Sequence, residues 1–161
     1  MTDGIRARDL MRTDFLSCRT DQTLGDAMVL LRGTQEQDGM PSALMVVDDA
    51  GEYRGMLTAR LLIRLLAGGH EAGAAIDDMM LLTVARDRLA TPLGDVLVEV
   101  PVVAPDDRLL AMMRSGAQMR LDFVPVVAEG RPVGFAPITA IFQAAAAMAL
   151  TPEDEGVRFD R

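Results

Sequence analysis

An internal repeat is the feature that most constrains the fold of this chain, because two copies of one pattern predict two copies of one structural unit. A polar-acidic pair followed by two large apolar residues occurs at residues 8–11 and again at residues 94–97. A short apolar segment follows in each copy, at residues 15–18 and 100–103. The 161 residues are therefore enough for two small units built on the same plan.

Each copy continues with the same order of predicted elements. Apolar residues recur at helical spacing from Leu24 and from Leu109, which predicts an amphipathic helix in each copy. A short apolar strand, a glycine-containing turn, a second strand and a second helix follow. The predicted strands are residues 44–47 and 53–57 in the first copy and 124–127 and 131–136 in the second, and the second helices are residues 58–66 and 138–150.

Three segments fall outside the shared pattern. Residues 33–43 are polar and rich in turn formers, so they are predicted to form a surface loop. The linker, residues 68–90, begins with glycines and then allows a helix over residues 74–89. The residues predicted to face inward from that helix are Ile76, Met79, Met80 and Val84. The acidic residues 151–161 are predicted to be a flexible tail.

The β–α–β–β–α order of the two copies resembles the CBS domain (named for cystathionine β-synthase), here as a tandem pair or Bateman module. The motifs that carry the resemblance are Asp9-Leu10-Met11, Val46-Val47-Asp48 and residues 55–62 in the first copy, and Asp95-Val96-Leu97, Pro125-Val126-Val127 and Gly134-Phe135-Ala136 in the second. The resemblance implies an α/β (α+β) fold in which two repeats, residues 7–67 and 91–150, pack sheet to sheet about a pseudo-twofold axis.

The resemblance also implies a ligand chemistry. CBS pairs bind adenosine-containing ligands such as AMP, ADP, ATP or S-adenosylmethionine in the clefts between repeats, where a Ser or Thr hydroxyl contacts phosphate or ribose and an Asp accepts from the ribose. The first copy keeps Gly55 and Thr58 of this pattern, but Leu61 stands in place of the Asp. In the second copy Pro137 replaces the hydroxyl residue and Ala140 replaces the Asp.

Four residues are candidates for ligand binding, namely Ser17, Thr58, Arg60 and Thr139. Ser17, Thr58 and Thr139 carry hydroxyls, and the guanidinium of Arg60 can pair with a phosphate. Three of the four also have a plainer reading. Thr58 can be a helix N-cap, Arg60 a solvated surface charge, and Ser17 a partner for a backbone group.

Composition excludes several classes of function. The net charge of −8 argues against a nucleic-acid partner, and the absence of lysine excludes Schiff-base and Walker-type chemistry. Cys18 and His70 are the only cysteine and the only histidine, so no catalytic site and no metal site is predicted. No uncharged apolar run is long enough to span a bilayer, and a single cysteine favours a reducing compartment. A cytoplasmic protein is therefore expected. The use of arginine without lysine, with much alanine and glycine, predicts a bacterium with a GC-rich genome as its source.

Two hypotheses follow for the function. The first is a stand-alone regulatory CBS-pair module without catalytic activity or cofactor, which senses an adenosine-containing ligand and modulates an unidentified partner protein. The alternative is a ligand-free dimerisation or protein-interaction module whose degenerate pockets are filled by Leu61, Val102 and Ala140. A homodimer is expected, with the apolar helices at residues 61–66 and 142–150 as candidates for its interface.

Overall fold

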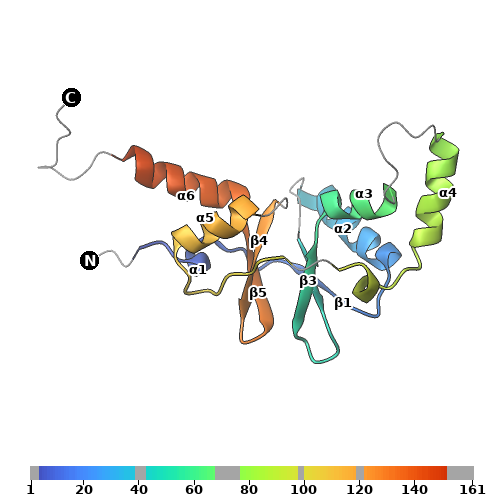
Figure 1. Ribbon diagram of the computed structural model, residues 1–161, viewed down its shortest axis with the longest axis horizontal. Helices are drawn as coiled ribbons and strands as arrows, with labels where there is room; N and C mark the ends of the chain where they lie inside the picture. Colours follow the sequence, from blue (N-terminus) through green and yellow to red (C-terminus); the bar gives the residue numbers. More distant parts are fainter. Residues whose placement is uncertain (1–3, 39–42, 68–76, 98–99, 119–121, 152–161) are drawn as a thin grey trace, which may run out of the picture.

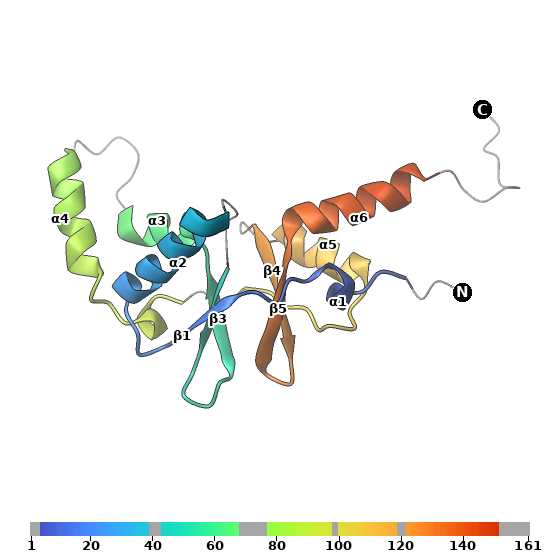
Figure 2. The ribbon, with the colours of Figure 1, turned by 180° about the vertical axis from the view of Figure 1, so that it is seen from behind.

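The computed structural model describes residues 4–38, 43–67, 77–97, 100–118 and 122–151, which form two halves lying side by side (Figure 1). Each half has a small sheet, and the main helices of both halves lie on the same side of the two sheets (Figures 1 and 2). The mixed α and β composition of the predicted fold class is confirmed.

The order of elements repeats along the chain, as the sequence predicts. The first half contains β1 (Leu16–Arg19), α2 (Leu24–Asp38), β2 (Leu44–Val47), β3 (Tyr53–Leu57) and α3 (Ala59–Ala67). The second half contains α5 (Leu109–Gln118), β4 (Phe123–Ala128), β5 (Arg131–Pro137) and α6 (Ile138–Leu150). Outside this pattern are α1 (Ala7–Leu10), α4 (Asp78–Arg88) and a short 3₁₀ helix, η1 (Leu93–Asp95).

The two sheets share one topology. Strand β1 pairs in parallel with β2, which pairs antiparallel with β3. In the second half β4 pairs antiparallel with β5, and Val103 forms a single parallel bridge with Val126 at the position that corresponds to β1. A parallel pair requires a crossover connection, and α2 and α5 supply it in the two halves.

The sheets pack on each other through a cluster of large apolar side chains. Met45 and Met56 come from the first sheet, and Phe123 and Phe135 come from the second. The two phenylalanine rings meet edge to face, with centroids 5.1 Å apart and an interplanar angle of 89°. Each half also has a core of its own between its sheet and its helices. The predicted sheet-to-sheet packing is thus a third core that joins the halves.

Each half is completed by a short helix from the other copy of the sequence pattern. Helix α1 precedes the first half along the chain, yet Ala7 is fully buried in the core of the second half. Helix η1 precedes the second half, yet Leu93 is fully buried in the core of the first. The two segments are the ones that the repeat equates, so the copies exchange their first helices.

Backbone hydrogen bonds hold both exchanged segments at corresponding positions. The corresponding bonds run from Ala7 N to Asp107 O (2.8 Å) and from Leu93 N to Gln22 O (2.8 Å), and from Leu109 N to Ile5 O (3.1 Å) and from Leu24 N to Thr91 O (3.0 Å). This reciprocity gives the halves an approximate twofold relation. The domain boundaries at residues 7–67 and 91–150 stay a prediction. They follow the order of the sequence, whereas packing assigns α1 to the second half and η1 to the first.

The prediction of a surface loop at residues 33–43 is wrong over the part that the structure describes as helix. Helix α2 continues to Asp38, so residues 33–38 are its last turns, while residues 39–42 lie outside the described residues. Gly33 is exposed, and a Cβ built on it meets no atom within 4 Å. Residues 33–38 carry no apolar stripe at helical spacing, which is why their composition resembles that of a loop.

The structure contains the predicted helix in the linker, α4, but the predicted inward orientation of its methionines is wrong. Helix α4 begins after Asp77, whose Oδ1 accepts from Met80 N at 2.8 Å. Met79 and Met80 are 70% and 55% exposed, and Val84 is half-buried. The reason is that α4 packs on α3 along one stripe near its C-terminal end, where Arg88 Nη1 donates to Leu65 O at 2.8 Å. Ile76 and residues 152–161 of the predicted tail lie outside the described residues.

The close approach of the N-terminal segment to β5 gives a stability prediction. A Cβ on Gly134 would lie 2.5 Å from Arg12 O, whereas Gly33 has open space around it. We expect Gly134→Ala to lower the free energy of unfolding by about 1–3 kcal/mol. The matched change Gly33→Ala should leave it unchanged or raise it by up to about 1 kcal/mol. Urea unfolding measures both, and equal effects of the two changes would contradict the structure.

The β2–β3 turn gives a pH prediction. Asp48 accepts from the backbone N–H groups of Glu52 (3.0 Å) and Ala50 (2.9 Å) and from the guanidinium of Arg54 (2.8 Å). These donors, the Glu52 N–H first, lower the pKa of Asp48. A lowered pKa in the folded state stabilises the protein above the unfolded pKa of about 3.9, and this contribution is lost as the pH falls through the folded pKa. Asp48→Asn should therefore flatten the acid limb of a stability–pH curve, whereas Asp49→Asn should leave that limb unchanged.

Candidate functional site

The four candidate residues lie on three parts of the fold. Ser17 is on the exposed side of β1, Thr58 joins β3 to α3, and Arg60 is in the first turn of α3. Thr139 is exposed in the first turn of α6, in the other half. The structure thus brings together Thr58 and Arg60, which are close in sequence, and places Thr139 on the other repeat.

Thr58 is a buried helix cap. Its side chain is only 2% exposed, and its Oγ1 accepts from Leu61 N at 3.2 Å. Its carbonyl accepts from Leu62 N at 3.0 Å, the first bond of α3. This is the plainer of the two readings of Thr58, and it leaves almost no hydroxyl surface for a ligand.

Arg60 reaches across the boundary between the halves. Its Nε lies 3.6 Å from Oδ2 of Asp122, and the two side chains are 65% and 54% exposed. The backbone carbonyl of Asp122 accepts from Ile138 N at 2.8 Å, which fixes the start of α6. An exposed pair of this length contributes little to stability, so Arg60 can exchange Asp122 for another anion at small cost.

Apolar residues stand at the two positions that carry the ribose-binding carboxylate in the family pattern. Leu61 is 8% exposed and belongs to the core of the first half. Ala140 is half-buried on α6, whose N-cap residue, Pro137, makes no side-chain capping bond. Val102, the third residue expected to fill a pocket, is instead 43% exposed.

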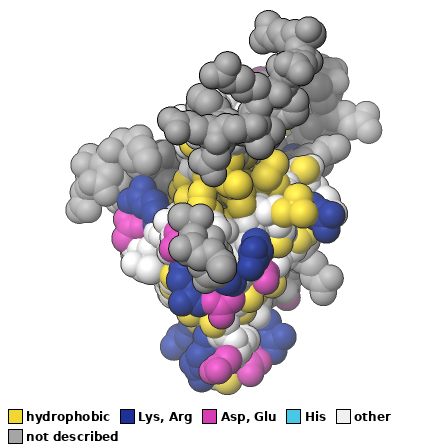
Figure 3. Space-filling model, turned by 90° about the vertical axis from the view of Figure 1, so that its left-hand side faces the viewer, with side chains coloured by type: hydrophobic (Ala, Val, Ile, Leu, Met, Phe, Trp, Pro, Cys, Tyr) yellow, Lys and Arg dark blue, Asp and Glu magenta, His cyan; other side chains and the backbone are white. Residues whose placement is uncertain are grey.

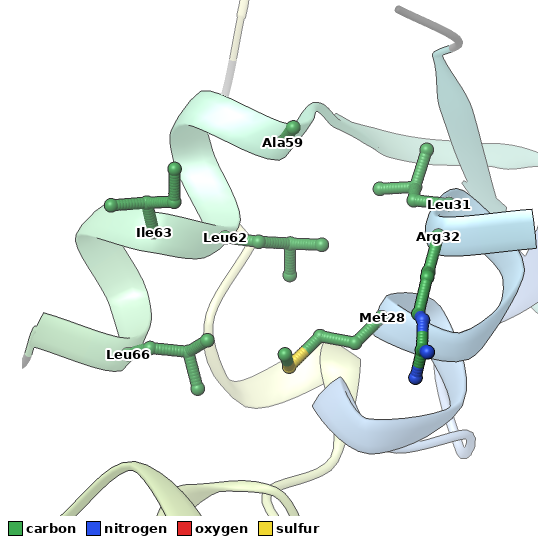
Figure 4. Close-up of a pocket in the computed structure, with 7 residues that line it drawn as sticks. All are labelled: Met28, Leu31, Arg32, Ala59, Leu62, Ile63 and Leu66. Carbon is green, nitrogen blue, oxygen red and sulfur yellow. The ribbon is translucent and has the colours of Figure 1, made fainter. Parts of the chain in front are cut away.

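Three surface cavities are found elsewhere, and the four candidate residues line none of these three. The first, of about 360 Å³, is an apolar groove between α2 and α3 (Figure 4). Its lining residues are Met28, Leu31, Arg32, Ala59, Leu62, Ile63 and Leu66. Figure 4 shows the side chains of Met28, Leu62 and Leu66 pointing into the space between the two helices.

The other two cavities differ in character. One, of about 690 Å³, lies between α2 and the end of α4 and shares Met28 and Arg32 with the α2–α3 groove. Val29 and Arg86 also line it, so the two cavities adjoin along α2. The other, of about 610 Å³, is polar and lies beside α1, where Arg8 forms an ion pair with Asp106.

Large apolar side chains are exposed along the helices that cover the two sheets. We call this surface the helical face, and its residues are Val29, Ile63, Leu110, Met113, Phe142, Met148 and Leu150. Figure 3 shows hydrophobic side chains gathered on the helical side of one end of the molecule. The sequence predicts the α3 and α6 parts of this face but not the contributions of α2 and α5, because their exposure depends on tertiary packing.

The described residues offer few groups that could form a catalytic or metal site. Among the described residues, no group of three or more His, Cys, Asp or Glu side chains is placed to hold a metal ion. Cys18 is 1% exposed, and burial, with a smaller effect of Asp26, raises the pKa of its thiol. His70 lies outside the described residues. No helix in the described part of the chain is both long enough and apolar enough to cross a membrane.

Comparison with known proteins gives one family match and several similar structures. Residues 7–68 match the model of the CBS domain. No curated protein matches the chain. Among solved structures, the CBS-pair protein CBSX2 from Arabidopsis thaliana is 19% identical, with a TM-score of 0.68 over 92% of this chain and 99% of that one.

Two further structures were determined with nucleotides. CBSX2 in complex with AMP is 21% identical, with a TM-score of 0.62 over 91% of this chain and 99% of that one. The cytosolic domain of the Mg²⁺ channel MgtE in complex with ATP is 22% identical, with a TM-score of 0.62 over 86% of this chain. This chain spans about half, 48%, of that domain.

The family model and the structural matches agree with the repeat found in the sequence and with the exchanged fold. Residues 7–68 therefore match the CBS domain, and the fold of the described residues is that of a CBS pair, which supports a tandem CBS pair, or Bateman module.

Proposed function

We propose that this chain is a regulatory module that acts by association, as a homodimer that modulates the activity of a partner protein in the cytoplasm. The observation that carries the proposal is the helical face, where Phe142, Met148 and Leu150 are 66%, 61% and 81% exposed. Exposed apolar surface of this kind marks association sites in proteins. The CBS-pair fold supports a regulatory rather than a catalytic role.

The exchanged helices support a mechanism for regulation. Each half contributes a helix to the core of the other, so a change in the angle between the halves must move α1 and η1 together with the sheets. A signal that favours one angle would shift the population of the whole module. The helical face spans both halves, so the same shift would change the surface that a bound protein meets.

A second proposal concerns the signal itself, an adenosine-containing ligand such as AMP, ADP, ATP or S-adenosylmethionine. Similar structures hold AMP and ATP, which favours this ligand class. In this chain Arg60 would exchange Asp122 for a phosphate, with the hydroxyls of Ser17 and Thr58 beside it and Thr139 in the second half. Binding would require Thr58 to become exposed, and Leu61 leaves the ribose without its carboxylate.

The association proposal predicts a dimer whose stability depends on the helical face. Sedimentation at micromolar concentration should give twice the chain mass of 17.4 kDa. Phe142→Ser and Ile63→Ser should each weaken the dimer about tenfold or more, because exposed apolar anchors dominate such interfaces. Val102→Ser, at an exposed apolar position away from the helical face, is the control and should leave the dimer intact. A monomeric wild type would overturn the proposal.

The ligand proposal predicts a rise in Tm with AMP, ATP or S-adenosylmethionine, because binding to the folded state stabilises it. Arg60→Ala should abolish the rise and leave the ligand-free Tm nearly unchanged, since its ion pair is exposed. Arg64→Ala, on the same helix, should keep the rise. Thr58→Ala should lose about 1 kcal/mol of stability and Thr58→Ser much less. If millimolar ligand leaves the wild-type Tm unchanged, the ligand proposal fails while the association proposal stands.

A further inference from the structure

The polar cavity of about 610 Å³ lies where the exchanged helix α1 meets the loop that leads into α5. Its lining residues are Gly4, Arg6, Arg8, Asp9 and Asp106, and none of these five is apolar. Helix α1 lies on the outer side of the second half (Figures 1 and 2). The cavity is therefore separate from the boundary between the halves, where Arg60 meets Asp122.

Two of the lining arginines belong to α1 and its N-cap, and hydrogen bonds hold them beside the loop before α5. Arg8 N donates to Pro105 O at 3.0 Å, and Arg6 Nη1 donates to the carbonyl of Asp106 at 2.8 Å. The guanidinium of Arg8 also forms an ion pair with the carboxylate of Asp106. Both guanidinium groups therefore gather at one residue of this loop.

A third arginine, Arg108, borders the cavity from the start of α5. Its backbone pairs with that of Arg6 in an antiparallel bridge. A Cβ built on Gly4, which lines the cavity, would lie 3.9 Å from Arg108 Nη1. Residues from both copies of the sequence pattern thus bring three guanidinium groups to one cavity.

Two of the carboxylates in this region bind backbone groups, and the third is easily displaced. Asp9 Oδ2 accepts from the N-cap N–H of α1 at 2.8 Å, and Asp107 Oδ2 accepts from Ala104 N at 2.8 Å. The side chain of Asp106 is 72% exposed and pairs with Arg8. An exposed ion pair contributes little to stability, so another anion can take the place of the Asp106 carboxylate at small cost.

The chemistry of the cavity selects a phosphate group as that anion. The planar guanidinium of arginine binds phosphate oxygens through pairs of charge-assisted hydrogen bonds. A phosphate group carries about −1.5 to −2 charges near pH 7, more than the single charge of a carboxylate. A nucleobase would find no apolar side chain among the lining residues. The matching ligand is therefore inorganic phosphate or a small polar phosphate ester.

We propose that α1 and the start of α5 form a binding site for a phosphate group, in which the guanidinium groups of Arg6, Arg8 and Arg108 replace Asp106 by the phosphate oxygens. The ligand would join α1, from the first sequence copy, to α5, from the second. It would thereby strengthen the attachment of an exchanged helix and hold the halves together more firmly. This site depends neither on the proposed dimer nor on an adenosine-containing ligand.

Calorimetric titration of the full chain tests the site, with inorganic phosphate and glycerol 3-phosphate as probes and chloride to keep the ionic strength constant. Arg8→Gln and Arg108→Gln should each weaken binding about tenfold or more, because each removes charged donors. Arg19→Gln is the matched control, since Arg19 forms a comparable exposed pair with Asp21 in the first half, and it should bind as the wild type does. The probe that binds more tightly tells whether the ligand is the free ion or an ester.

Removing the resident carboxylate gives a change of opposite sign. Asp106→Asn should tighten phosphate binding about two- to fivefold, because the ligand then displaces no ion pair. Asp21→Asn, the matched change in the first half, should leave the affinity unchanged. Equal effects of these two changes would contradict the displacement of Asp106.

Three outcomes would overturn the site. The first is that neither probe binds at millimolar concentration, and the second is that the Arg8 and Arg108 variants bind like the wild type. The third is that Arg60→Ala abolishes phosphate binding, which would place the phosphate at the boundary between the halves and support the proposed adenosine-containing ligand instead. Retained phosphate binding in Arg60→Ala keeps the two proposals distinct.

Discussion

The exchange of short helices between the two halves is the constraint on which the rest of this structure depends. Ala7 and Leu93 are fully buried, each in the core of the half that its own sequence copy does not build. Matching backbone bonds fix both segments, and Gly134 allows the N-terminal chain to pass close to β5. The chain thus crosses between the halves twice, and the two sheets pack against each other. The helices are left on one side, and their outer surfaces become the helical face.

Most of the fold was predictable, because each element of the repeat occurs twice in the sequence and the two copies can be compared. Helix α6 has the predicted bounds, and α3 is shifted by one residue because Thr58 serves as its cap. The errors fall where only one copy carries the segment. Residues 33–38 carry no apolar stripe although they end a helix, and α4 is apolar on several sides, so no stripe in its sequence reveals which side packs. Periodicity identifies a buried face only when a helix has a single one.

The candidate site was predictable in its chemistry but not in its geometry. The sequence locates Thr58 and Arg60, and it shows that Leu61 replaces a carboxylate. It does not show that the Thr58 hydroxyl is buried in a cap or that Arg60 pairs with Asp122 from the other half. The exposed residues of α2 and the groove between α2 and α3 also depend on how the helices pack, and local patterns carry no information on that.

The exchange also bears on how a chain of this kind can arise. A single copy of the pattern contains a sheet and two helices, but the short helix that it carries packs on the core of another copy. Such a copy would lack a buried part of its own core until it met a second one, and two copies would complete each other reciprocally. The present chain is then the covalently joined form of that pair, in which the linker has replaced a concentration-dependent encounter by an intramolecular one.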